Sequence, residues 1–168
     1  MGSQVSGQRC PIAVIGDRVR GLPDPELPML TLGDLGLIHA VFTDPEGRVV
    51  VEFTPTFLGC PALWAITSAI TRILTDCGHP DALVRQVLAP AWSTDRITAC
   101  GRRKLAEHGI APPAPTTAPE LVRSGHGLPC PNCRSRATRP QSPFGPTRCQ
   151  SVLLCTACRE TFPYLATV

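Results

Sequence analysis

The sequence is poor in aromatic and in charged residues, and it contains no long apolar run. Aromatic side chains make up 5% of the 168 residues and charged side chains 17%, whereas 43% of the residues are hydrophobic. This balance is typical of a globular chain and not of a disordered one. The longest uncharged run, residues 53–71, contains prolines, a glycine and several threonines, so we do not expect it to cross a membrane.

Signatures of secretion and of common enzyme classes are also missing. The first ten residues lack the apolar core of a secretory signal, and an odd number of cysteines, nine, is typical of reduced thiols. The chain contains no Gly-rich phosphate loop, no HExxH motif, no GxSxG nucleophile elbow and no kinase signature. We therefore expect a cytoplasmic protein that is not catalytic by itself.

The distribution of charge and proline predicts two units. Residues 1–122 carry ten basic and twelve acidic side chains, whereas residues 123–168 carry six basic and one acidic side chain. Such asymmetry indicates two different surfaces. The stretch GIAPPAPTTAP at 109–119 is typical of an extended linker. The expected division is a first domain at 10–110, a Pro/Ala/Thr-rich linker at 111–128 and a C-terminal module at 129–168.

Within the first domain, the spacing of apolar residues predicts an α-β-β-α-β-α order. Asp44, Pro45 and Gly47 suit a turn between the first two strands, and Ser93 or Thr94 suits the N-cap of the last helix. The predicted fold class is α+β, a small three-stranded sheet covered by helices. The helices are expected at 10–22, 63–74 and 93–109, and the strands at 36–42, 48–55 and 82–88.

Four cysteines in the C-terminal module predict a metal site. Cys130 and Cys133 form one CxxC pair, and Cys155 and Cys158 form another, with 21 residues between the pairs. Each CxxC turn directs two thiolates at one point, and four thiolates make the tetrahedral cage that zinc favours. Because so small a module cannot fold on its apolar surface alone, metal binding would supply much of its folding free energy. We expect a zinc ribbon that holds one structural zinc ion per chain.

Other interpretations of these cysteines stay open. The two pairs could be redox-active CxxC motifs, and four thiolates also suit iron, as a rubredoxin-like centre or a cluster. Cys149 and His126 could be spare ligands, although a packed or partly exposed position in the hairpin is the simpler interpretation.

Nucleic-acid binding by the ribbon is a further hypothesis. The module is basic, but only three of its aromatic side chains could stack on bases, so docking of a protein is the simpler function. The arginines concerned are Arg134, Arg136, Arg139 and Arg148, and the aromatic residues are Phe144, Phe162 and Tyr164.

Cys60 is the remaining cysteine with a distinctive position. It follows a predicted strand and Gly59, and it precedes Pro61 at the start of a predicted helix. A thiol at an N-cap faces unpaired N–H groups and the positive end of the helix dipole, which would lower its pKa. A buried, inert cysteine is equally consistent with this position. Asp24 and Glu26, taken alone, are typical of a solvated turn.

Several segments resemble known families. DPELPMLTLGDLGLIHAV, VEFTPTFLGCPA and LAPAWSTDRIT together resemble the iron–sulfur assembly domain shared by SufT-like and MIP-type targeting factors. The tail CPNCRSRATRPQSPFGPTRCQSVLLCTACRETFPY resembles the C-terminal ribbon of the PaaD (also PaaJ) family, and its FGPTRC segment at 144–149 is fairly specific to that family. The resemblance covers residues 12–165, with departures at Gln150 and in the terminal FPYLATV.

The resemblance implies an accessory, maturation-type protein of the multicomponent phenylacetyl-CoA 1,2-epoxidase, which acts in aerobic phenylacetate degradation. Its partners would be the oxygenase subunits or the flavin/iron–sulfur reductase, into which it would help to insert iron or an iron–sulfur cluster. The resemblance also marks Cys60, with Asp24 and Glu26, as a functional surface that holds iron or a cluster transiently. The alternatives are a stoichiometric structural subunit of the epoxidase and a zinc-ribbon nucleic-acid-binding protein.

Overall fold

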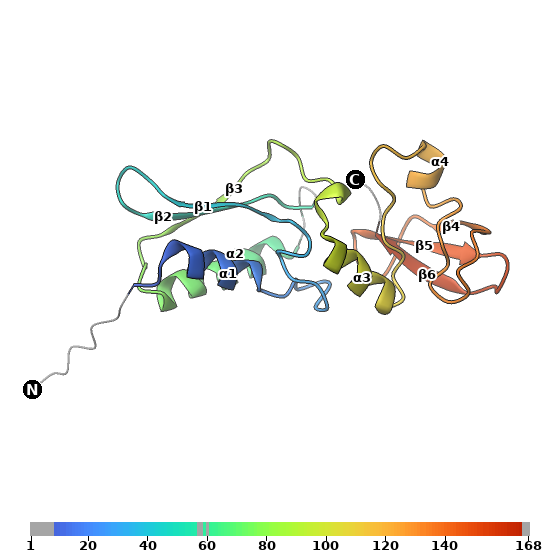
Figure 1. Cartoon of the computed structure of the whole chain (residues 1–168), viewed down its shortest axis with the longest axis horizontal. Helices are drawn as coiled ribbons and strands as arrows, with labels where there is room; N and C mark the ends of the chain where they lie inside the picture. The colour runs from blue at the N-terminus through green and yellow to red at the C-terminus, as the bar shows by residue number, and fades with distance from the viewer. Residues whose placement is uncertain (1–8, 57–58, 60, 166–168) are drawn as a thin grey trace, which may run out of the picture.

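The computed structural model describes residues 9–56, 59 and 61–165, and it contains two small sheets side by side (Figure 1). The first sheet consists of β1 (Ile38–Thr43), β2 (Val49–Phe53) and β3 (Leu83–Gln86), with β2 in the centre. Strands β1 and β2 are antiparallel, whereas β2 and β3 are parallel. The predicted α+β fold class with a three-stranded sheet is confirmed.

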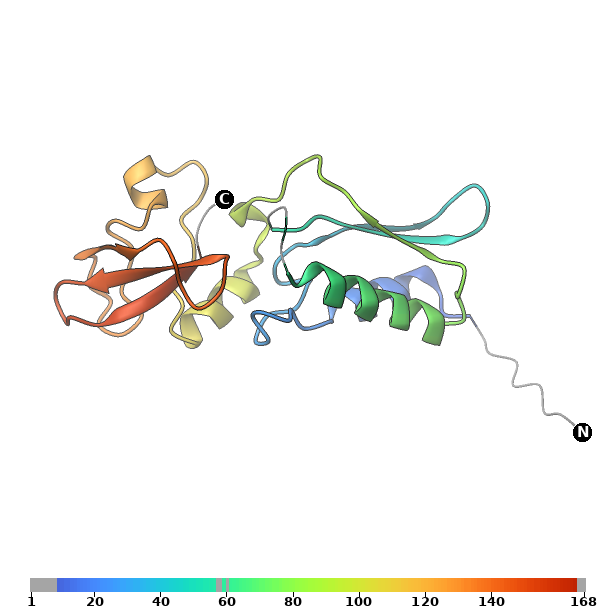
Figure 2. The same cartoon turned by 180° about the vertical axis from the view of Figure 1, so that it is seen from behind.

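Two helices cover one face of the first sheet (Figures 1 and 2). They are α1 (Ile12–Arg20) and α2 (Leu63–Asp76), and α2 forms the crossover that two parallel strands require. Its apolar side chains recur at three and four residues and are buried, as the periodicity predicts. The buried residues of α2 are Ile66, Ile70, Ile73 and Leu74.

Helix α2 begins at Leu63, as the apolar pattern predicts, but its N-cap is not the expected residue. Its N-cap is Ala62, without a side-chain hydrogen bond, and the first helical bond runs from the Ile66 N–H to the Ala62 carbonyl. The expected N-cap at Cys60, with Pro61 as the first helical residue, is therefore wrong by two positions. Within the described part of the chain, no helix is long and apolar enough to cross a membrane.

The helix predicted at 93–109 consists of two elements. A 3₁₀ turn, η1 (Thr94–Arg96), is followed by α3 (Ala99–Glu107), and the extended backbone of Ile97 separates them. The Thr98 hydroxyl accepts the Gly101 N–H at 3.0 Å, so Thr98 is the N-cap and the prediction of Ser93 or Thr94 was wrong. Helix α3 lies between the two sheets (Figures 1 and 2).

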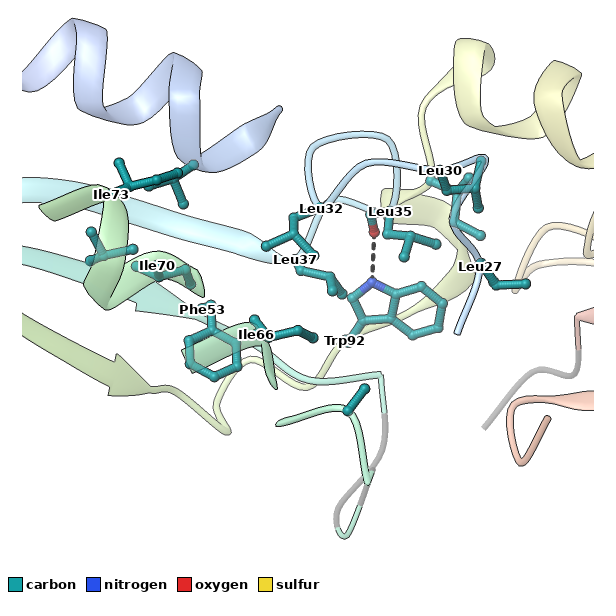
Figure 3. Close-up of a cluster of buried hydrophobic side chains, with 14 of the residues drawn as sticks. Leu27, Leu30, Leu32, Leu35, Leu37, Phe53, Ile66, Ile70, Ile73 and Trp92 are labelled. Carbon is teal, nitrogen blue, oxygen red and sulfur yellow. Dashed lines mark hydrogen bonds between the residues drawn. The ribbon is translucent and has the colours of Figure 1, made fainter. Parts of the chain in front are cut away.

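A leucine-rich loop before β1 supplies much of the first core (Figure 3). Its leucines pack against Phe53 and α2. Trp92 belongs to the same cluster, and its indole N–H donates a hydrogen bond to the Leu35 carbonyl at 2.8 Å. This hydrogen bond and the loop's own backbone bonds, such as Leu30 N–H to the Leu27 carbonyl and Leu37 N–H to the Leu32 carbonyl, satisfy polar groups of the loop, so it can be buried without a helix or strand. The buried leucines are Leu27, Leu30, Leu32, Leu35 and Leu37.

The second unit is an antiparallel ribbon with its own small core. It contains α4 (Glu120–Arg123), β4 (Thr138–Ser142), β5 (Gln150–Cys155) and β6 (Thr161–Leu165), with β5 in the centre. The core of the ribbon combines apolar side chains with two of the cysteines. Its buried members are Ala111, Ala114, Leu128, Cys130, Leu153, Cys155, Phe162 and Tyr164.

The segment at 111–128, expected as an extended linker, packs onto the ribbon. The Ala111 N–H donates to the Pro163 carbonyl at 2.8 Å and so extends the ribbon sheet. The guanidinium of Arg102 donates to the carbonyls of Thr94 and Pro113 at 2.7 and 2.6 Å, which ties α3 to this segment. The proline-rich composition is therefore compatible with a fixed strap, since proline carbonyls remain available as acceptors.

We expect Trp92→Phe to lower the free energy of unfolding by about 1–3 kcal/mol, because the Leu35 carbonyl would be buried without a donor. The matched control is Trp64→Phe, since Trp64 is 79% exposed whereas Trp92 is 7% exposed; its effect should stay within about 0.5 kcal/mol. Urea denaturation followed by circular dichroism measures both. Equal effects of the two substitutions would contradict this account of the core.

Candidate functional site

The two CxxC segments of the ribbon fold into turns of the same geometry. The Cys130 N–H donates to the Ser135 carbonyl at 2.9 Å, and the Arg134 N–H returns to the Cys130 carbonyl at 2.9 Å. In the second turn, the Cys155 N–H and the Arg159 N–H make the corresponding bonds, to the Glu160 and Cys155 carbonyls, at 2.9 and 2.8 Å.

Both turns depend on a left-handed residue directly after the second cysteine. Arg134 has φ +62° and Arg159 has φ +64°. Side chains rarely adopt this conformation, and strained backbone persists where the surrounding structure requires it. The matching strain in the two turns indicates that both are built to present their cysteines in one orientation.

The four thiols meet at one point between the turns. Their sulfur atoms all lie within 4.8 Å of one another, with Cys130 and Cys158 3.8 Å apart and Cys133 and Cys155 3.6 Å apart. Sulfurs bound to one tetrahedral zinc ion at about 2.3 Å would be about 3.8 Å apart. Two of the thiols are buried and two are exposed, which is typical of a cage at the edge of a small module. The geometry fits a four-cysteine metal site.

Backbone donors prepare this cluster for negative charge. The N–H groups of Cys158 and Ala157 lower the pKa of the Cys155 thiol to about 7. The Ser135 N–H favours the Cys133 thiolate, but the neighbouring thiols raise the pKa of Cys133 to about 12. Four thiolates can therefore coexist only if a cation compensates their charge.

Two candidate spare ligands lie outside the cluster. His126 is exposed, and its Nδ1 lies 3.4 Å from the Ser124 hydroxyl. Cys149 is buried, but it packs with the core of the first unit. The interpretation of these residues as non-ligands of the four-thiol site agrees with the geometry.

The acidic residues Asp24 and Glu26 lie at the contact between the two units. Asp24 Oδ1 accepts the N–H groups of Glu26 and Leu27, both at 2.9 Å, which closes a tight turn. Asp24 is 7% exposed, so the expectation of a solvated turn was wrong for it; burial raises the pKa of its carboxyl group. Glu26 is half-buried, and its Oε2 lies 3.8 Å from the Cys149 sulfur.

Sequence reasoning placed Cys60 beside these acids, but Cys60 lies outside the described residues. The contact with Cys149 was missed, because nothing in the spacing of a ribbon indicates which side of it faces another unit. Asp34, a further acid of the same loop, has a structural role. Its Oδ2 accepts hydrogen bonds from the Lys104 ammonium at 2.6 Å and from the Thr31 N–H at 3.0 Å. Although burial acts in the opposite direction, the Lys104 and Thr31 donors lower the pKa of Asp34.

These features define a two-unit protein, an α+β domain joined to a four-cysteine ribbon, and comparisons with known families identify both units. The family model of the iron-sulfur cluster assembly protein matches residues 13–81, and that of the PaaD zinc beta ribbon domain matches residues 114–166. The chain belongs to the PaaD family. The resemblance inferred from the sequence is thereby confirmed.

Individual relatives cover either the whole chain or its first unit. The chain is 42% identical over 147 residues, 85% of each protein, to an Escherichia coli K12 protein that bears the provisional name of a 1,2-phenylacetyl-CoA epoxidase subunit. It is 33% identical over 76 residues, 45% of this chain and 85% of the relative, to the Fe-S protein maturation auxiliary factor SufT of Staphylococcus aureus. A domain of unknown function from Bacillus anthracis superposes with a TM-score of 0.50 and 27% identity, over 56% of this chain and 90% of that one.

We expect the purified chain to contain one metal ion, and Cys155→Ser to lose it because Cys155 is a fully buried member of the cluster. Cys100→Ser is the control, since Cys100 is a free cysteine at the start of α3, outside the cluster. Elemental analysis measures metal per chain, and thermal unfolding with and without chelator measures the linked stability. Retention of metal by Cys155→Ser would exclude the four-thiol site.

Proposed function

We propose that the chain is an accessory protein of a phenylacetyl-CoA epoxidase system that assists insertion of iron or an iron–sulfur cluster into the oxygenase or the reductase of that system. The observation that carries this proposal is the similarity to the Escherichia coli protein over 85% of both chains, which spans both units at once. The similarity of the first unit to SufT, named a maturation auxiliary factor, favours a maturation role.

In this proposal the ribbon metal is structural zinc. Four sulfur donors in a tetrahedral arrangement fit zinc, which is redox-inert and so holds a small module without chemistry of its own. Cys130, Cys133, Cys155 and Cys158 would hold it. The ribbon then serves as a docking element for the client protein.

The first unit carries the proposed transfer surface. Cys60 would be the functional thiol, with Asp24 and Glu26 as neighbouring acids. The sequence places Cys60 directly after Gly59, whose φ of +87° fits the turn that leads from β2 toward α2. A thiolate and carboxylates together offer soft and hard donors, which suits transient binding of iron.

A stoichiometric structural subunit of the epoxidase is the second candidate, because the Escherichia coli relative is named as a subunit. Nucleic-acid binding has less support. Of the three ribbon aromatics that could stack on bases, Phe162 and Tyr164 are buried in the ribbon core, whereas Phe144 is 83% exposed. Stacking platforms need several exposed rings along one groove.

The maturation proposal predicts that clients made without this chain contain less iron. The reductase and the oxygenase are expressed with the chain, without it, and with Cys60→Ala, and are then purified to the same standard. Iron and acid-labile sulfide per client should fall several-fold without the chain and with Cys60→Ala. The Cys100→Ser variant is the control and should load the clients normally.

Two outcomes distinguish the candidates. Full iron and sulfide content in the absence of the chain would refute maturation. Co-purification at fixed stoichiometry, with epoxidase activity that depends on adding back the chain to fully loaded components, would establish the subunit role instead.

A further inference from the structure

Two further cysteines meet where α1 begins and α2 ends. Cys10 lies just before α1, Cys77 is the C-cap of α2, and the Cys10 N–H donates to the Cys77 carbonyl at 3.0 Å. The start of α1 and the end of α2 lie at the end of the first unit that faces away from the ribbon (Figures 1 and 2). Neither cysteine belongs to the four-thiol cluster. Their pairing therefore needs an explanation other than the ribbon metal.

The backbone of Cys10 is held against the end of α2 at two points. Besides the bond to the Cys77 carbonyl, the His79 ring Nε2 lies 3.2 Å from the Cys10 carbonyl oxygen. The end of α2 is itself closed, since the Cys77 and His79 N–H groups donate to the carbonyls of Ile73 and Leu74, both at 2.9 Å. Two residues joined by a backbone hydrogen bond lie roughly 5–6 Å apart at Cα, and disulfides span about 4.4–6.8 Å. The backbone thus already has the spacing of a disulfide-bonded pair.

One guanidinium group lies against both thiols. Arg18 of α1 donates from Nη1 to the Cys77 sulfur at 3.1 Å. Its contacts with the Cys77 sulfur and, more weakly, with the Cys10 sulfur raise the pKa of Arg18. Among the described residues, Arg18 forms no ion pair with a carboxylate. Its charge is therefore available to a thiolate, which is the reacting form of cysteine.

The two thiols differ in exposure, and this difference assigns them successive steps. Cys10 is partly exposed, whereas Cys77 is 1% exposed. Burial and the neighbouring Cys10 thiol raise the pKa of Cys77, while the Arg18 guanidinium opposes the change. Cys10 is thus the thiol that an oxidant in solution reaches, and Cys77 is the thiol that reacts next.

We propose that Cys10 and Cys77 form a reversible disulfide, with a low-molecular-weight disulfide such as glutathione disulfide as the oxidant. The Cys10 thiolate attacks one sulfur of the oxidant, whose S–S bond breaks, and the first glutathione leaves and takes up the proton that Cys10 lost. The Cys77 thiolate then attacks the Cys10 sulfur, and the second glutathione leaves in the same way. Two protein thiols are oxidised and one glutathione disulfide is reduced to two thiols. Excess thiol reverses both steps.

The disulfide fastens together the two helices that cover the first sheet (Figure 1). Because it closes a covalent loop from residue 10 to residue 77, it lowers the conformational entropy of the unfolded chain. The oxidised chain should therefore unfold at a temperature roughly 5–15 °C above that of the reduced chain. The inference goes beyond the proposed function, since this site shares no residue with the transfer surface or with the ribbon metal site.

The test uses the full chain, reduced and with zinc in the ribbon, so that the metal protects the four cage thiols. The chain is incubated anaerobically in buffers of reduced and oxidised glutathione, its free thiols are alkylated, and its tryptic peptides are identified by mass spectrometry. We expect one cross-link, between the peptides 10–18 and 73–85, which excess dithiothreitol removes. Cleavage leaves Cys60 in a separate peptide, 49–72, so a cross-link to Cys60 is distinguishable.

Variants test the two steps separately. Cys10→Ser and Cys77→Ser should each abolish the cross-link, and Cys77→Ser should leave Cys10 as a mixed disulfide with glutathione. Cys100→Ser is the thiol control and should cross-link as the unaltered chain does, although Cys100 also has an arginine beside it, with Arg103 Nη2 at 3.5 Å.

The part of Arg18 is measured by the rate at which the mixed disulfide closes. Arg18→Gln should slow closure several-fold, because Cys77 loses the charge that favours its thiolate. Arg20→Gln removes an exposed arginine of the same helix and should leave the rate unchanged.

Zinc content and the unfolding midpoint verify the fold of each variant, and the peptide map of the unaltered chain depends on no variant. The proposal is overturned if peptides 10–18 and 73–85 do not cross-link, or if Cys10 of the unaltered chain stops at the mixed disulfide. A cross-linked chain that unfolds at the same temperature as the reduced chain also overturns it. Equal closure rates for Arg18→Gln and the unaltered chain overturn the assignment of Arg18.

Discussion

The four-cysteine cage is the constraint on which the arrangement of the two units depends. The ribbon core consists of a few buried side chains, two of which are cysteines of the cage, and so small a core cannot stabilise the module without a metal. Cys155, in the cage, ends β5, and Cys149 directly precedes the same strand. Strand β5 therefore acts as a rigid spacer of about 20 Å between the cage and the acidic loop, which is the loop before β1 that carries Asp24, Glu26 and Asp34. A loss of the cage would release Cys149 from this loop.

The acidic loop is held from two sides. From one side, α3 packs closely on it: the Thr98 N–H donates to the Asp34 carbonyl at 2.9 Å, and a Cβ at Gly101 would lie 2.8 Å from that oxygen. From the other side, the ribbon contributes Cys149 and Leu165 to the core that contains Leu27. Helix α3 and the strap that follows it thus do more than link the units, because they fix the distance between loop and ribbon.

Much of this fold follows from local sequence patterns. The spacing of apolar residues in α2, the turn at Asp44–Gly47 and the two CxxC pairs each specify their structure through contacts within a few residues. The division of the helix at Ile97 was not predictable in this way, because no glycine or proline between Ser93 and Ala99 marks a break. The true cap, Thr98, is a good N-cap residue that lay inside the expected helix.

The contact between Cys149 and the acidic loop could not be predicted from the sequence for a different reason. Its members lie more than one hundred residues apart, in units whose relative placement depends on α3 and the strap. The turn at Asp24 was expected to be solvated because its acids lie in a stretch without a strong helical pattern. In the structure Asp24 is buried, in a hollow that is lined by residues of the first unit and by Cys149 and Leu165 of the ribbon.

Hydrogen exchange of the full chain before and after removal of the ribbon metal tests this coupling most directly. The account predicts faster exchange in the ribbon and also at the Glu26 and Leu27 amides, whose acceptor Asp24 lies under the ribbon contact. Faster exchange confined to residues 111–165, with the Glu26 and Leu27 amides unchanged, would contradict it.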